Sequence, residues 1–419
     1  MKIGIARECS LNEARVALIP ENIVRLSEKG VTFYVETGAG LAAGYNDQDY
    51  LNAGAEIKSS AEEIHQQADI VLQVNLSAEV LAQIFDQLHE GQLLIGMMDP
   101  LGEPEKFAAL SEQGITSVAM ELIPRISRAQ SMDVLSSMAT LAGYKAMVVA
   151  ASLSKRIFPM MMTAAGNLSP ARVFIMGAGV AGLQAAATAK RMGAVVEAYD
   201  VRPAAREQII SVGAKPIELA LDAESTEDQG GYAKAQGDDF LNRQRELMTE
   251  VLAQQDIVIT TAAIPGAKSP VLITAEMVRH MKPGAIIVDL ASERGGNCEL
   301  TQHGEVVVEH EVTIIGPDNI VSTVAQHASQ MFGNNIESFL NHILNDQGEY
   351  ILDFDDEIIR EAVVNYGGDI QNPRVREKLG LSPLPASSLT SAPAVGSTMA
   401  SSPSEESSLA TESVIEEVA

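Results

Sequence analysis

A glycine-rich stretch in the middle of the chain constrains the fold more than any other feature. Residues 177–182 read GAGVAG, follow an apolar run at 172–176 and precede a helical pattern over 183–192. A second apolar run, 195–199, leads directly into Asp200. A strand, such a turn, a helix and a second strand ending in an acid together form a dinucleotide-binding unit. The stretch therefore predicts a Rossmann domain.

The residues of this unit have separate predicted roles. Gly177 permits a tight turn, Gly179 lets the backbone approach a pyrophosphate, and Gly182 lets the helix pack closely on the strand. The pyrophosphate would lie on the unpaired N–H groups at the start of the helix. Asp200 would accept hydrogen bonds from the adenosine ribose, and its charge would repel a 2′-phosphate. NAD(H) is therefore favoured over NADP(H), although Arg202 is an opposing signal.

Short apolar runs alternate with helical patterns along most of the chain. The runs expected to form strands are residues 2–6, 32–36, 70–74, 93–97, 116–120, 172–176, 195–199, 257–260, 285–289 and 312–315. Strands that alternate with helices indicate βαβ units and parallel sheets. These runs are too many for one sheet with such regular helices, so we expect two α/β domains.

The predicted domain boundaries follow from composition and from a long helical stretch. Residues 1–130 form the first domain, and residues 131–325 form the Rossmann domain, which begins with a connecting helix over 131–158. Helical patterns at 325–345 and 355–365 place residues 326–373 back on the first domain. Residues 381–419 contain 11 Ser and 4 Pro but no aromatic residue, Lys or Arg, and such a segment is expected to be disordered.

Charge and hydropathy exclude several classes of protein. Lys and Arg number 29 against 56 Asp and Glu, and a net charge of −27 argues against nucleic acid as a partner. The longest apolar run, 140–153, is split by Lys145, whereas a spanning helix needs about 20 apolar residues. Two cysteines cannot form a disulfide framework. We therefore expect a cytoplasmic protein without its own membrane span.

Three stretches resemble the alanine dehydrogenase/proton-pumping transhydrogenase family. They are residues 3–17, with IGIARE followed by NEARVA; residues 177–200; and residues 124–133, which read PRISRAQSMD. The third stretch is the most specific and resembles a loop of the NAD(H)-binding alpha subunits of transhydrogenases. The resemblance covers residues 1–373. It implies two doubly wound parallel-sheet domains, a flavodoxin-like N-terminal domain and a Rossmann domain, which flank a cleft.

The resemblance also implies roles for individual residues. Arg125 would hold the nicotinamide amide, Asp133 would orient Arg125, and Gln130 would bridge to a second nucleotide; these three are the expected catalytic residues. The remaining residues expected to bind NAD(H) are Ser131, Gly177, Ala178, Gly179, Val180, Gly182, Asp200, Val201, Arg202, Gly231, Tyr232, Gln244, Ala263, Ile264 and Pro265. Residues 230–237 resemble a mobile loop that closes over the nucleotide, with Gln236 where some relatives have Met.

The implied reaction is direct hydride transfer from NADH to NADP+. Such a transfer needs no protein acid or base, because the hydride carries both electrons. This agrees with the sequence, in which seven scattered histidines form no catalytic constellation and no metal site is expected. The implied partners are a second copy of the chain in a homodimer, a membrane-spanning subunit and an NADP(H)-binding beta subunit. The chain would then lie peripherally on the cytoplasmic face of a membrane, with proton movement in the partner chains.

Two alternatives stay open. An NAD-dependent alanine dehydrogenase would need an acid/base group, and we expect in that branch a Lys near position 73 and a His near position 97. Gln73 and Met97 stand there instead, although Arg15 is a plausible carboxylate binder. A non-catalytic NAD(H)-sensing module is the other alternative. It would not need the nicotinamide-side residues Arg125, Gln130 and Asp133.

Overall fold

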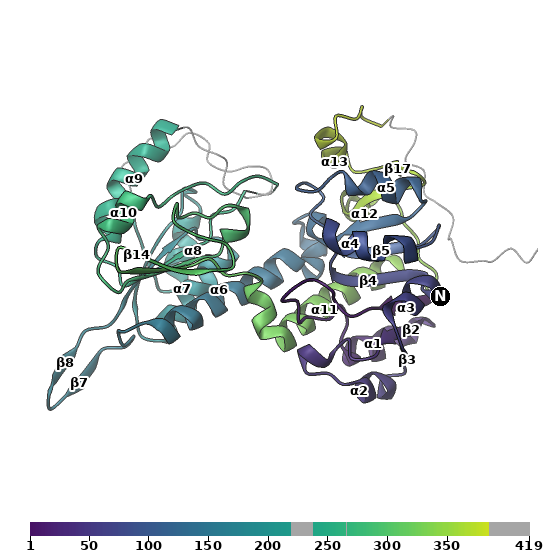
Figure 1. The fold of residues 1–419 in the computed structure, drawn as a ribbon, viewed down its shortest axis with the longest axis horizontal. Helices are drawn as coiled ribbons and strands as arrows, with labels where there is room; N and C mark the ends of the chain where they lie inside the picture. Colours follow the sequence, from purple (N-terminus) through teal and green to yellow (C-terminus); the bar gives the residue numbers. More distant parts are fainter. Residues whose placement is uncertain (219–237, 265, 385–419) are drawn as a thin grey trace, which may run out of the picture.

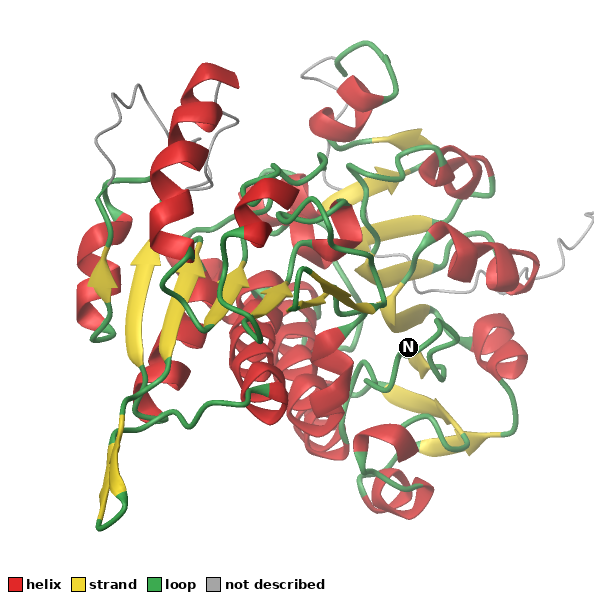
Figure 2. Ribbon diagram, turned by 60° about the vertical axis from the view of Figure 1, so that its left-hand side comes forward, coloured by secondary structure: helices red, strands yellow, loops and turns green. Residues whose placement is uncertain are grey.

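The fold is that of a computed structural model, which describes residues 1–218, 238–264 and 266–384. The described chain forms two halves, each built around its own sheet (Figure 1). Two long helices, α6 (Val134–Leu153) and α11 (Ala325–Ile343), lie between the halves (Figures 1 and 2). The α/β class with two doubly wound sheets is therefore confirmed.

The first sheet has the strand order β17-β16-β6-β5-β4-β1-β2-β3. Its strands are β1 (Lys2–Ile5), β2 (Thr32–Glu36), β3 (Glu56–Lys58), β4 (Ile70–Asn75), β5 (Leu93–Met97), β6 (Thr116–Ala119), β16 (Val363–Tyr366) and β17 (Asp369–Ile370). β1 to β6 are parallel, whereas β16 pairs antiparallel with β6, and β17 antiparallel with β16. The order β2-β1-β4-β5-β6 is that of a flavodoxin-like sheet, to which β3 adds one edge strand. The helices of this half are α1 (Pro20–Leu26), α2 (Asp47–Asn52), α3 (Ala61–Gln67), α4 (Ala78–Ile84), α5 (Lys106–Glu112), α12 (Glu357–Ala362) and α13 (Pro373–Lys378).

The second sheet has the order β11-β10-β9-β12-β13-β15-β14. Its strands are β9 (Arg172–Met176), β10 (Val195–Tyr199), β11 (Lys215–Pro216), β12 (Ile257–Thr260), β13 (Ile286–Asp289), β14 (Val306–Glu309) and β15 (Val312–Ile315). All are parallel except β14, and the strand order reverses between β9 and β12, as in a Rossmann domain. Helices α7 (Val180–Arg191), α8 (Ala205–Ser211), α9 (Asp238–Leu252) and α10 (Ala275–Arg279) connect the strands.

Two sequence-based expectations were wrong in detail. The helix expected over 131–158 begins at Val134 and ends at Leu153; a hairpin of β7 (Met161–Thr163) and β8 (Gly166–Leu168) follows it. The helix expected over 355–365 stops at Ala362, and β16 begins at the next residue. Val363 and Val364 are fully buried, and β16 pairs with β6, so a long-range contact outweighs the local helical pattern.

Helix α6 contributes to the hydrophobic cores of both halves. Val134 and Met138, near its start, pack in the first core with Phe332 and Phe339 of α11. Ala146 and Met147, near its end, pack in the second core. Within the described part of the chain, α6 is the one helix long and apolar enough to cross a membrane by length and composition. In this structure α6 packs against α7 of the second half and against α11.

Candidate functional site

The glycine-rich turn lies between β9 and α7, at the point where the strand order reverses. Gly177 has φ +101°, and a Cβ there would lie 2.6 Å from Thr261 Oγ1. A Cβ at Gly182 would lie 1.8 Å from the Gly177 carbonyl oxygen, so the helix can pack here only without a side chain. A Cβ at Gly179 would meet open space within 4 Å. The turn is therefore closed on the protein side and open on the side where a ligand would lie.

The start of α7 is available to an anion. Gly179 is the N-cap and provides no side chain to accept from the first N–H groups of the helix. Helix α6 fixes this helix start from the other side, because a Cβ at Gly143 would lie 2.0 Å from the Ala181 carbonyl oxygen. A helix N-terminus held rigidly with unpaired N–H groups attracts phosphate oxygens.

Asp200 links the turn to the end of β10. One carboxylate oxygen accepts the Ala178 N–H at 2.7 Å, and both oxygens accept from the Arg202 guanidinium at 2.9 Å. The Ala178 N–H is therefore already used, which leaves a pyrophosphate the N–H groups further along the turn. The pair also restrains Arg202, since its guanidinium must leave Asp200 before it can reach a 2′-phosphate.

Two buried side chains, those of Asp289 and Asn297, hold the loop after β12. Thr260 Oγ1 donates to Asp289 at 2.9 Å, and Asp289 accepts further bonds from Thr301 and from the backbone of Asn297. The Asn297 side chain accepts the Ala262 N–H at 2.9 Å and donates to the Ala262 carbonyl at 2.8 Å. The exposed loop that follows is thus anchored at its base.

The loop before α6 presents polar side chains to solvent. Arg125, Gln130 and Ser131 are exposed, and residues 127–132 form a 3-10 helix rather than the α-helix expected from Ser131 onward. Asp133 is the N-cap of α6 and accepts from the Ser136 N–H at 2.8 Å and from Ser136 Oγ at 2.6 Å. A polar N-cap explains why the helix begins after this residue.

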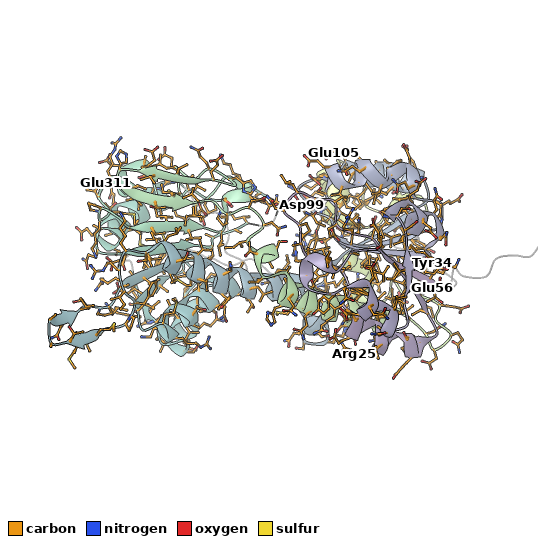
Figure 3. All side chains as sticks on the ribbon, turned by 60° about the horizontal axis from the view of Figure 1, so that its bottom comes forward. Arg25, Tyr34, Glu56, Asp99, Glu105 and Glu311 are labelled. Carbon is orange, nitrogen blue, oxygen red and sulfur yellow. The ribbon has the colours of Figure 1, made fainter. Side chains whose placement is uncertain are left out.

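An ion pair joins the two halves. Asp99, after β5, lies 2.6 Å from the Arg294 guanidinium of the second half, and Figure 3 shows Asp99 where the halves approach each other. Asp99 has φ +46°, a backbone conformation that Glu121 supports by accepting the Met98 and Asp99 N–H groups. Burial raises the pKa of Glu121 to about 7, against the lowering effect of these hydrogen bonds.

A pocket of about 560 Å³ lies beside this ion pair. Leu101 and Glu105 line it from the first half, Lys268 and Arg294 from the second, and Lys378 from α13. The carboxyl ends of both sheets border it, which is where ligands bind in open α/β sheets. The two halves therefore border an open cleft, with loops after β5 on one side and loops after β12 and β13 on the other.

Arg15 is not available as a carboxylate binder in this arrangement. Its Nε and one terminal nitrogen donate to both oxygens of Glu13, at 2.8 and 2.6 Å, and both side chains are buried. Burial favours the neutral acid, but the hydrogen bonds and charge of Arg15 outweigh it and lower the pKa of Glu13. Gln73 is also buried, and its side-chain oxygen has no hydrogen-bond partner among the described residues.

Four predicted site residues cannot be placed in full. Gly231, Tyr232 and Pro265 lie outside the described residues, as does the expected mobile loop, and Gln244 lies on α9 in a stretch whose side chains are not described. Sequence reasoning missed Asp99 and Arg294. No motif marks an ion pair between residues so far apart in the chain.

A Rossmann sheet with an open glycine-rich turn, facing a second α/β half across a cleft, defines the class of two-domain NAD-binding dehydrogenases. Residues 4–142 match the N-terminal domain of the alanine dehydrogenase/PNT family, and residues 146–373 match its C-terminal domain. The chain belongs to this family of NAD-binding oxidoreductases, as the sequence resemblance indicated.

Relatives from both branches of the family match most of the chain. It is 46% identical over 377 residues to an NAD(P) transhydrogenase alpha subunit of Rhodospirillum rubrum, covering 89% of this chain and 98% of that protein. A transhydrogenase structure from Sinorhizobium meliloti is 42% identical, with a TM-score of 0.77 over 89% of this chain and 99% of that one. The alanine dehydrogenase of Bacillus subtilis is 28% identical over 92% of this chain and 97% of its own length.

Proposed function

We propose that this chain is the NAD(H)-binding alpha subunit of a proton-translocating NAD(P)+ transhydrogenase, which passes a hydride from NADH to NADP+ held on a partner subunit. The observation that carries the proposal is the state of Arg15. Arg15 is buried and donates to both oxygens of Glu13, so it is not free to clamp a substrate carboxylate, as a free-standing amino-acid dehydrogenase would require. The identity to transhydrogenase alpha subunits supports the same choice.

The residues of the second half fit NAD(H). The open space above Gly179 accommodates a pyrophosphate, which the N–H groups of Gly179 and Val180 would hold at the start of α7. Asp200 would bind the adenosine ribose beside Val201, once Arg202 has turned away from the carboxylate. Ala263, Ile264 and Pro265 would border the nucleotide from the loop that Asn297 anchors, and Gly231, Tyr232 and Gln244 would contact its adenosine side.

The protein's contribution to the reaction is positioning. NADH, when bound, supplies the hydride from its dihydronicotinamide ring, so this chain needs no acid or base. Arg125 would hold the ring amide, Asp133 would orient Arg125, and Gln130 would reach the second nucleotide. The Asp99–Arg294 pair would hold the halves together and exclude water, which keeps the two rings at reacting distance.

The domain organisation and partners are part of the proposal. Residues 1–130 with 326–373 would form one domain, and residues 131–325 the other. The chain would form a homodimer and lie on the cytoplasmic face of a membrane, bound to a membrane-spanning subunit and an NADP(H)-binding beta subunit that carry the proton path. The exposed β7–β8 hairpin supports self-association, because Met160 and Met162 are 65% and 75% exposed.

The test combines the purified chain with its cognate NADP(H)-binding subunit. NADPH formation from NADH and NADP+, dependent on both proteins, is the expected result. A parallel assay contains the chain alone with NAD+ and L-alanine, and measures whether L-alanine is oxidised. Oxidation of L-alanine by the chain alone would instead establish the alanine dehydrogenase alternative, and NADH binding without any transfer would establish the sensing module.

A further inference from the structure

The loop that carries Gln130 receives support from the C-terminal region of the chain. Residues 127–132 form a 3-10 helix, which has poorer hydrogen-bond geometry than an α-helix. Arg128 stands two residues before Gln130, and Ser131 follows it directly. Both make hydrogen bonds to segments more than 200 residues later in the chain. Gln130 therefore lies between two residues that are tied to these later segments.

The first support is a two-pronged ion pair. The Arg128 guanidinium donates to both oxygens of Asp356, at 3.0 and 2.5 Å. Asp356 is also the N-cap of α12, where it accepts the Ile358 N–H at 2.8 Å, and His342 of α11 lies 2.7 Å from it. The hydrogen bonds from Arg128 lower the pKa of Asp356 to about 2, against a raising effect of burial. Asp356 is thus ionised at any physiological pH.

The second support is a buried amide. Asn335 of α11 is 5% exposed and donates from Nδ2 to the Ser131 carbonyl oxygen at 2.7 Å. Its Oδ1 has no hydrogen-bond partner among the described residues. A buried polar atom without a partner costs free energy, and an apolar residue would avoid this cost. The contact with Ser131 is the one described interaction that its side chain makes.

We propose that Arg128, Asp356 and Asn335 are positioning residues, which fix the loop so that Gln130 and Arg125 meet the reacting rings. This inference rests on the proposed function, because it needs a nicotinamide at the loop. Hydride transfer depends steeply on the distance between the rings, so a loosened loop slows transfer more than it weakens NADH binding. Most of the binding contacts lie on the second half, which these residues do not touch.

The chain contains a matched control for a role in stability alone. Arg25 makes a similar two-pronged pair with Glu337 of α11. The side chains of that pair are 50% and 14% exposed, against 50% and 16% for Arg128 and Asp356. Figure 3 shows Arg25 at the bottom of the first half in this view, apart from Asp99. Arg25→Gln therefore removes a comparable ion pair, together with the contact of Arg25 with Asn334, without removing a hydrogen bond to the loop.

The experiment compares Arg128→Gln, Asn335→Ala and Arg25→Gln in the full chain with the NADP(H)-binding subunit. We expect Arg128→Gln and Asn335→Ala to slow single-turnover hydride transfer by about 10-fold or more, with the NADH dissociation constant changed less than about 3-fold. Arg25→Gln keeps the transfer rate within about 2-fold of the wild type. Arg128→Lys, which retains one contact with Asp356, recovers part of the rate. Equal effects of Arg128→Gln and Arg25→Gln would overturn the inference.

A second measurement separates this inference from the proposed function. The fluorescence of bound NADH reports the surroundings of the dihydronicotinamide ring without any transfer. If the wild type binds NADH but transfers no hydride, the proposed function fails. The positioning role then stands only if Arg128→Gln changes this fluorescence and Arg25→Gln does not. If the wild type binds no NADH, both proposals are wrong.

Discussion

Gly179 is the N-cap of α7 and Gly182 lies three residues later in the first turn of this helix, yet their surroundings are opposite. A methyl group at Gly179 would point into open space, whereas one at Gly182 would overlap the Gly177 carbonyl oxygen. The first glycine is thus kept free for a ligand, and the second is required by the packing of α7 on β9. Sequence spacing predicted both roles, because the turn is a local structure.

This contrast gives a pair of expected outcomes. Gly179→Ala changes the free energy of unfolding by about 1 kcal/mol or less, but raises the NADH dissociation constant about 10-fold or more, because the methyl group occupies the pyrophosphate space. Gly182→Ala destabilises the second half by about 3 kcal/mol or more, since α7 must move. Denaturation and NADH titration of both variants measure the two effects. Equal NADH affinity of Gly179→Ala and the wild type would contradict the assigned role of this residue.

Glu8 gives a prediction about pH. It is buried shortly after β1 and accepts the N–H groups of Val74 and Asn75 at 2.6 and 3.2 Å. Burial raises the pKa of Glu8 to about 8, although these hydrogen bonds act in the opposite direction. Between about pH 5 and 8 the folded chain holds a proton on Glu8 that the unfolded chain lacks. This contribution to stability is complete at lower pH and is lost as the pH rises to about 8.

The change Glu8→Gln removes this titration. The stability of the wild type relative to the variant should fall by up to about 1.4 kcal/mol per pH unit across that window and level off above it. Denaturation of both proteins at several pH values measures the difference, and subtraction removes the contribution of the histidines. A difference that stays constant with pH would show that Glu8 titrates normally.

Among the elements, the longer parallel strands followed from the sequence, whereas the short parallel edge strands β3 and β11 and the antiparallel strands did not. The β9 and β10 strands have the predicted bounds, because each is a short buried apolar run beside a helix start. β16 was read as helix, since its identity depends on pairing with β6, about 250 residues earlier. The hairpin after α6 was also missed, because its strands pair with each other and are exposed, so no burial pattern marks them.

The β7–β8 hairpin carries a prediction on oligomeric state. It projects from the second half (Figure 1), and Met162 is 75% exposed at its edge. We expect Met162→Glu to weaken self-association on the order of 100-fold, because a carboxylate would be buried in the dimer. Val308→Glu, at another exposed edge strand where Val308 is 66% exposed, is the control. Sedimentation at several concentrations measures both, and an unchanged dimer in Met162→Glu would exclude the hairpin as the interface.

At the scale of the molecule, one ion pair bridges the mouth of the cleft. We expect Asp99→Asn to speed NADH dissociation about 3-fold or more, because the contact with Arg294 loses its charge and the halves separate more readily. Stopped-flow displacement of NADH measures this rate. Glu276→Gln breaks an exposed pair with Arg279 inside the second half and serves as the control. Equal dissociation rates in Asp99→Asn and the wild type would show that the pair does not restrain the cleft.

The two sides of the site differ in how far sequence could predict them. The glycine-rich turn belongs to one continuous βαβ unit, made of β9, α7 and β10, so its residues and their roles could be derived from spacing. The loop with Arg125 and Gln130 was identified only through family resemblance, since its local pattern indicates a capped helix. Its supports, Asp356 and Asn335, come from the far end of the chain. They become neighbours only when α11 packs between the halves.

The central claim is direct transfer of a hydride from NADH on this chain to NADP+ on the partner. The most direct test uses NADH deuterated at the transferred position of C4, mixed with NADP+, this chain and the NADP(H)-binding subunit. The account predicts that the deuterium appears in NADPH and that none exchanges with water. NADPH without the label would show an intermediate that exchanges with solvent, and a complete absence of NADPH would remove the transhydrogenase assignment.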